Sequence, residues 1–169
     1  MKYVLAAVLI FALSAFAGEV PKEGDTAPPV SLPGQDGQTV GLSDFPGKWV
    51  VLYFYPKDMT PGCTIEAHNF QRDLAKYTEA NAVILGVSVD STESHTQFCT
   101  KESLTFHLLS DTGHQVVEEY GSFRNPPGIA MRNTFLIGPD GKIAKVWTGV
   151  NPSHHSEEVL AELASLQKK

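Results

Sequence analysis

The feature that most constrains the fold is an uninterrupted apolar and aromatic run from Trp49 to Tyr55. A run of strand length without polar interruption is typical of a central strand that is buried on both faces. Pro56 ends the run, and Thr60-Pro61-Gly62-Cys63 opens a segment with helical character that extends to about Tyr77. A buried strand followed so closely by a helix predicts an α/β architecture.

The rest of the chain continues this alternation. Residues 24–47 are rich in Gly, Pro, Asp and Ser and predict short edge strands and turns. Further elements are predicted in the order strand, helix, strand, helix, two-stranded hairpin and final amphipathic helix: 82–89, 93–102, 106–109, 114–120, 134–137 with 142–148, and 153–166. We therefore predict an α/β sandwich with a mixed central β-sheet flanked by helices.

The first seventeen residues differ from all that follows. Lys2 precedes an apolar run that closes with Ala15-Phe16-Ala17, which is the pattern of a signal peptide with a small-residue cleavage site. We expect export, with the periplasm as the location, and a single domain over residues 18–169 without stable membrane association after cleavage. The alternative is an uncleaved anchor, but the run is shorter than the roughly 20 residues that a spanning helix needs.

Composition narrows the functional classes. A chain of 169 residues suits one domain. Its formal net charge of -6, with no basic stripe, argues against nucleic acid as a partner. The only cysteines are Cys63 and Cys99, and in an exported chain two cysteines form a structural disulfide by default. Composition alone leaves open whether such a bond is structural or catalytic.

The residues before Cys63 point to chemistry. Thr60 is a suitable N-cap and Pro61 suits the first helical position, so Cys63 is predicted to lie in the first turn of a helix. Unpaired backbone N–H groups and the positive end of the helix dipole favour a thiolate over a thiol there. A thiolate is the form that attacks a peroxide oxygen.

The segment from Pro56 to Ala67 resembles the peroxidatic loop of peroxiredoxins, specifically of the peroxiredoxin Q (bacterioferritin comigratory protein) branch. Residues 24–28, 88–91, 108–111 and 132–137 resemble the same family, in the family's order. The resemblance implies a thioredoxin-like fold. It also implies a thiol-dependent peroxidase that reduces hydrogen peroxide and organic hydroperoxides without a metal or organic cofactor.

The resemblance also implies roles for individual residues. Cys63 is the peroxidatic cysteine, Pro56 shields it, and Thr60 hydrogen-bonds the thiolate and the substrate. Arg132 supplies a cation, and its forked donors can reach two oxygens at once. Glu66, one helical turn after Cys63, matches the family's acidic residue and is expected to orient Arg132 or relay a proton. The alternative for Glu66 is a solvated glutamate in the first turn.

The position five residues after Cys63, where many peroxiredoxin Q chains carry a second cysteine, holds His68. Resemblance to a second subgroup of the family implies that Cys99 resolves the sulfenic acid by forming an intramolecular disulfide with Cys63. Such a bond requires the first turn of the helix to unwind. The expected reductant is a thioredoxin-like dithiol protein. The resemblance also implies a monomer, because the enzymes of this branch are mostly monomeric.

Three alternatives remain open at this stage. The histidines suggest a zinc or copper site. His95 and Cys99 are four residues apart and could share one face of a predicted helix, but no group of histidines has the spacing of a dedicated metal site. A thiol-disulfide oxidoreductase would need a C-x-x-C pair, and Thr60 stands where its first cysteine would be. A noncatalytic binding domain would use the two cysteines only to staple its helices.

Overall fold

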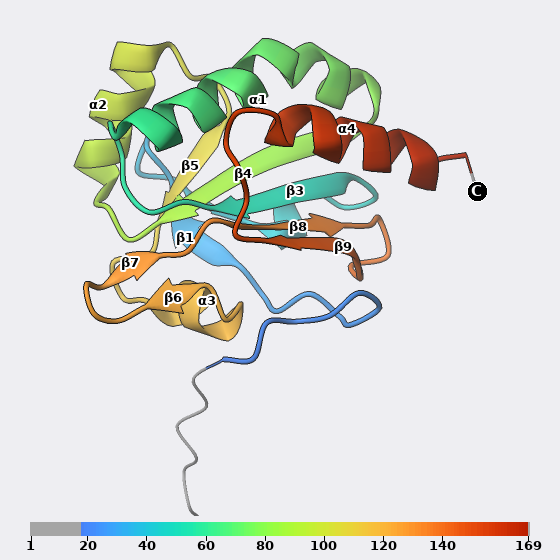
Figure 1. Ribbon diagram of the computed structural model, residues 1–169, viewed down its shortest axis with the longest axis horizontal. Helices are drawn as coiled ribbons and strands as arrows, with labels where there is room; N and C mark the ends of the chain where they lie inside the picture. Colours follow the sequence, from blue (N-terminus) through green and yellow to red (C-terminus); the bar gives the residue numbers. More distant parts are fainter. Residues whose placement is uncertain (1–17, 169) are drawn as a thin grey trace, which may run out of the picture.

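The computed structural model describes residues 18–168, and a five-stranded sheet forms its centre (Figure 1). Its strands are β3 (Trp49–Phe54), β4 (Ala82–Ser88), β5 (His107–Ser110), β8 (Asn133–Ile137) and β9 (Ile143–Thr148). The strand order is β5-β4-β3-β8-β9, in which β3, β4 and β5 are parallel while β8 and β9 pair antiparallel. The predicted mixed central sheet is confirmed.

Strand β3 is the middle strand of the sheet and contributes to both halves of the core. Val51 and Tyr53 point into a core cluster on one face, whereas Val50, Leu52 and Phe54 point into a second cluster on the other. Alternate side chains of a strand lie on opposite faces, so both faces must be covered when every residue is apolar. The prediction of a doubly buried strand is confirmed.

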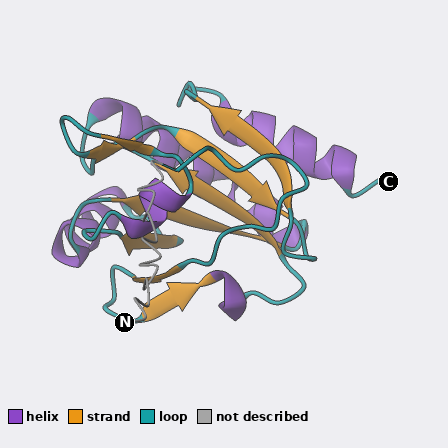
Figure 2. Ribbon diagram, turned by 90° about the horizontal axis from the view of Figure 1, so that it is seen from below, coloured by secondary structure: helices purple, strands orange, loops and turns teal. Residues whose placement is uncertain are grey.

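Helices cover one face of the sheet, and shorter elements cover the other (Figure 1). The first layer contains α1 (Pro61–Glu79), α2 (Thr92–Glu102) and α4 (His155–Leu166). The second contains α3 (Gln115–Glu119), with the short pairs β1 (Ser31–Pro33) with β2 (Thr39–Gly41) and β6 (Phe123–Arg124) with β7 (Ile129–Ala130). Figure 2 shows this layering from below, with the long helices behind the strands.

Two local differences from the sequence-based expectations stand out. The sequence predicts no strand between residues 120 and 134, but this segment contains the β6–β7 hairpin. The last helix begins at His155 rather than Ser153, because the Asn151 side chain accepts a hydrogen bond from the Ser153 backbone N–H and holds a turn there. The predicted signal peptide lies outside the described residues. None of the helices within residues 18–168 is both long and apolar enough to cross a bilayer.

Candidate active site

Cys63 lies in the first turn of α1, directly after the loop that follows β3. Thr60 is the N-cap residue with extended backbone, and Pro61 is the first helical residue, as predicted. The Cys63 side chain is 2% exposed. Its sulfur therefore lies at the amino end of a long helix, where backbone N–H groups lack intrahelical partners and favour an anion.

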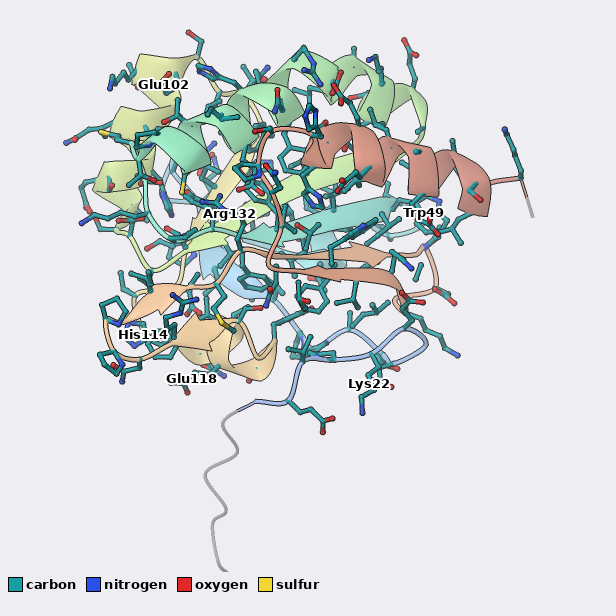
Figure 3. The ribbon with its side chains drawn as sticks, in the orientation of Figure 1. Lys22, Trp49, Glu102, His114, Glu118 and Arg132 are labelled. Carbon is teal, nitrogen blue, oxygen red and sulfur yellow. The ribbon has the colours of Figure 1, made fainter. Side chains whose placement is uncertain are left out.

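Arg132 connects this turn with the sheet. It lies one residue before β8, and Figure 3 shows it between the sheet and α1. Its Nη2 donates to Cys63 Sγ at 3.5 Å, and its Nη1 donates to Glu66 Oε2. The sequence singled out all three residues, and the structure brings them together at one point.

The approach of the guanidinium to the helix depends on a residue without a side chain. A Cβ at position 62 would lie 3.2 Å from Arg132 Nη2, closer than most such contacts. Gly62 therefore lets Arg132 reach the first turn of α1. Because Gly62 directly precedes Cys63, this close packing sets the position of the cation relative to the sulfur.

Glu66 is buried, in contrast to the alternative of a solvated glutamate. Burial raises the pKa of its carboxyl to about 7, although the charge and hydrogen bond of Arg132 act in the opposite direction. Its Oε1 has no hydrogen-bond partner, and neither does the buried hydroxyl of Tyr53. Burial raises the pKa of Tyr53 well above its usual range, as do the charges of Glu66 and Cys63. The phenol therefore stays protonated beside the cysteine.

Thr60 is placed as predicted but does not make the expected capping bond. Its hydroxyl donates to the Lys57 carbonyl at 2.9 Å, and its side chain accepts no bond from the helix N–H groups. The hydroxyl proton closes the loop before the helix, which leaves the oxygen lone pairs as acceptors. Pro56 lies at the start of this loop and lines the same surface groove as Arg132.

Cys99 lies on α2, in the helix where the sequence placed it. It is 9% exposed and belongs to the same core cluster as Cys63. Burial, followed by the negative charge of Asp58, raises the pKa of the Cys99 thiol to about 11. Both cysteines are free thiols, so the structure represents the reduced state.

The two cysteine-bearing helices are also joined at their surfaces. His68 Nε2 lies 2.8 Å from Glu102 Oε2, and Glu102, labelled in Figure 3, is the last residue of α2. Gln71 links α1 to the loop after α2, because its Oε1 accepts from the Thr105 backbone N–H at 2.8 Å. These contacts hold α1 against α2 and the loop that follows it, beyond the first turn of α1 that carries Cys63.

Comparison with known proteins identifies the family. The AhpC/TSA family model matches residues 23–146. The peroxiredoxin Bcp of Bacillus subtilis (strain 168) is 42% identical over 152 residues, which cover 86% of this chain and 97% of that protein. The chain belongs to the peroxiredoxin family. It is an oxidoreductase, a thiol-dependent peroxidase, and the alternative of a noncatalytic binding domain is wrong.

Solved structures place this peroxiredoxin in the Bcp/PrxQ branch and confirm its thioredoxin-like fold. A cysteine-to-serine mutant of the Xylella fastidiosa PrxQ has a TM-score of 0.83 and 36% identity, covering 89% of this chain and 99% of that one. The bacterioferritin comigratory protein of Xanthomonas campestris has a TM-score of 0.78 and 34% identity, covering 88% and 96%. That Xanthomonas campestris protein has alkyl peroxide reduction activity.

Sequence reasoning did not identify one polar cluster of this peroxiredoxin. Asp58, in the loop before α1, contacts Tyr55 and His95, and all three are buried. The helical spacing of His95 and Cys99 suggested only a potential metal site. No signal in the sequence links Asp58 with His95, because their contact depends on the packing of α2 against the loop. Across residues 18–168, no three His, Cys, Asp or Glu side chains are grouped as metal ligands.

Proposed function

We propose that Cys63 is the peroxidatic cysteine and that Arg132 stabilises both its thiolate and the transition state. The observation that carries this proposal is the 3.5 Å contact between Arg132 Nη2 and Cys63 Sγ at the amino end of α1. The thiolate attacks one oxygen of the peroxide. A sulfur–oxygen bond forms, the oxygen–oxygen bond breaks, and the departing oxygen takes up a proton, which leaves Cys63 as a sulfenic acid.

Three neighbours complete this step. Glu66 holds the guanidinium through Nη1, and with its pKa at about 7 part of the population carries a proton that Oε1 can deliver to the departing oxygen. Thr60 donates to the Lys57 carbonyl, so its lone pairs are available to accept the peroxide O–H. Pro56 covers the site from the side of the groove.

Cys99 then resolves the sulfenic acid by forming an intramolecular disulfide with Cys63. The shared core cluster of the two free thiols supports this pairing. Disulfide geometry is short-ranged, so the first turn of α1 unwinds for the bond to form. A thioredoxin-like dithiol protein reduces the disulfide and restores both thiols.

The substrates are hydrogen peroxide and organic hydroperoxides. A groove beside Arg132 supports the second class, because its lining is largely apolar. The apolar residues there include Pro56, Ile129, Ala130, Met131 and Val150. The alkyl part of a hydroperoxide fits this lining while the peroxide oxygens reach the guanidinium.

The enzyme acts outside the cytoplasm as a monomer. The pattern of residues 1–17 supports export with cleavage before Gly18, which defines residues 18–169 as the mature domain. The periplasm is the corresponding compartment, and the reductant is then a thioredoxin-like protein of that compartment.

Mass spectrometry of the purified protein tests the cycle. The reduced mature chain is treated with one equivalent of hydrogen peroxide, alkylated, digested and mapped. We expect a linked peptide containing Cys63 and Cys99 in the wild type, a sulfenic acid on Cys63 in Cys99→Ser, and no rapid peroxide consumption in Cys63→Ser. Equal peroxide consumption by wild type and Cys63→Ser contradicts the assignment of Cys63. A wild-type disulfide between two molecules contradicts the assignment of Cys99.

A further inference from the structure

The buried Asp58 carboxylate lies at the centre of a hydrogen-bonded cluster. The Tyr55 hydroxyl donates to its Oδ1 at 2.7 Å, the Ser94 hydroxyl donates to its Oδ2 at 2.7 Å, and His95 Nδ1 lies 2.8 Å from the same Oδ2. Burial opposes ionisation of Asp58. The bonds from His95, Ser94 and Tyr55 outweigh it, and the pKa of the carboxyl is lowered. Asp58 is therefore an anion that accepts three bonds.

This arrangement determines the tautomer of His95. An ionised carboxylate can only accept, so Nδ1 must carry the proton, and Nε2 is the ring nitrogen that is left to exchange a proton with another group. The imidazole is fully buried, and Nε2 has no hydrogen-bond partner. Leaving a buried polar atom without a partner destabilises the folded protein. Such an atom in a folded enzyme calls for a functional explanation.

The residue that can use this acceptor is Cys99. His95 and Cys99 are both on the buried face of α2 and are four residues apart, a spacing that brings Cβ atoms within about 5–6 Å of each other. Burial and the negative charge of Asp58 raise the pKa of the Cys99 thiol to about 11, so the thiol form dominates at neutral pH. Disulfide formation requires the thiolate. A buried thiol that must react at neutral pH therefore needs a base.

We infer that His95 is the general base that deprotonates Cys99 in the resolving step, and that Asp58 holds it in the required tautomer. This inference rests on the proposed function of Cys99 as the resolving cysteine. Three observations support the inference. Nε2 of His95 has no partner, Nδ1 of the same ring is bound to Asp58, and Cys99 lies one helical turn away. The hydrogen bond between Nε2 and the thiol forms as the two helices rearrange for disulfide formation.

The step balances without an outside oxidant. Nε2 takes the proton from Cys99 Sγ, and this sulfur attacks the sulfenic sulfur of Cys63. The sulfur–sulfur bond forms while the sulfur–oxygen bond breaks, and the departing hydroxyl receives the proton from His95 and leaves as water. The Cys99 sulfur is oxidised and the Cys63 sulfur is reduced.

A His95→Asn variant tests the inference, because the asparagine amide can still donate to Asp58 but cannot act as a base. Reduced protein is mixed with hydrogen peroxide, quenched with an alkylating reagent at short times, and analysed for sulfenic acid and disulfide over a range of pH. The pH profile has to be interpreted with the other titratable groups near the imidazole, which are Tyr55, Asp58 and Cys99. Asp90 is one step further away and accepts a hydrogen bond from the Asp58 backbone N–H. We expect the resolving rate at neutral pH, relative to sulfenic acid formation in the same sample, to fall about 100-fold or more.

The pH profile separates a base from a structural support. In His95→Asn the resolving rate should increase in proportion to hydroxide concentration, and added imidazole should partly restore it at neutral pH. The wild-type rate should level off at lower pH than that of the variant. His107→Asn is the matched control, because His107 on β5 also has an unpartnered ring nitrogen but lies outside this cluster. It should resolve at the wild-type rate and with the wild-type pH profile.

The resolving rate of His95→Asn and its pH profile can also contradict the inference. A resolving rate in His95→Asn equal to that of the control overturns the inference, and so does a slower rate with an unchanged pH profile. If His95→Asn does not fold, Asp58→Asn replaces it, because the loss of the carboxylate frees the imidazole tautomer and should also slow resolution. Absence of the Cys63–Cys99 disulfide in the wild type contradicts the proposed function itself, and is visible in the same digests.

Discussion

Replacing Arg132 with methionine tests the electrostatic basis of the peroxidatic site. Nη2 lies 3.5 Å from the Cys63 sulfur, and two full charges at this separation interact by about 5 kcal/mol at an effective dielectric constant of about 20. That value is an upper limit, because the guanidinium charge is delocalised and shared with Glu66. A hydrogen bond to a charged group contributes about 1.5–3 kcal/mol, which corresponds to about a 10- to 150-fold change in rate.

We therefore expect Arg132→Met to reduce the second-order rate constant for peroxide by about 10- to 150-fold. Stopped-flow mixing in a Cys99→Ser background isolates the first step, because the sulfenic acid cannot then be resolved within the molecule. Arg124→Met with hydrogen peroxide as the substrate is the matched control, since Arg124 is an exposed arginine of the β6–β7 hairpin and hydrogen peroxide has no alkyl part to occupy the groove that Arg124 lines. A rate constant for Arg132→Met equal to that of the Arg124→Met control would refute the electrostatic argument.

Three further predictions concern the same region. Burial raises the Glu66 pKa from its ordinary 4.5 to about 7. The folded wild type should therefore lose about 3 kcal/mol of its free energy of unfolding as pH rises through this interval. Urea unfolding at several pH values measures this loss, which should be absent in Glu66→Gln. Gly86→Ala places a Cβ 2.7 Å from the Tyr53 ring, and should lower the free energy of unfolding by about 1–3 kcal/mol in thermal or urea melts. Gly62→Ala should slow the peroxide step in stopped-flow assays by displacing Arg132, while urea melts show unchanged or increased stability, because alanine favours the helix.

Local patterns were sufficient to predict most of the elements that build the scaffold. The apolar run of β3 predicted a strand covered on both faces, and both faces carry core clusters. The Thr60-Pro61 pair predicted the start of α1. Because these signals depend on residues close together in the chain, they can be recognised without the tertiary structure. The short β6–β7 hairpin was missed because two-residue strands carry no periodicity.

The partners of the site residues could not be derived from local patterns. Family resemblance singled out Arg132, yet it is 69 residues from Cys63, and their contact depends on β8 lying beside β3 in the sheet. The sequence leaves the burial of Glu66 open, because a glutamate near the start of a helix is solvated unless another segment covers it. Only the packed structure shows its pairing and the consequent rise in its pKa.

The sequence by itself determined that Cys63 follows a buried strand and lies at the start of a helix, because strand burial and helix initiation depend on residues close together in the chain. Tertiary structure alone decided that Asp58 meets His95, 37 residues away, and that the second ring nitrogen is left without a partner. Such a pairing arises when α2 packs against the loop before α1. Contacts between distant segments follow from the packing of the whole core, and no local periodicity encodes them.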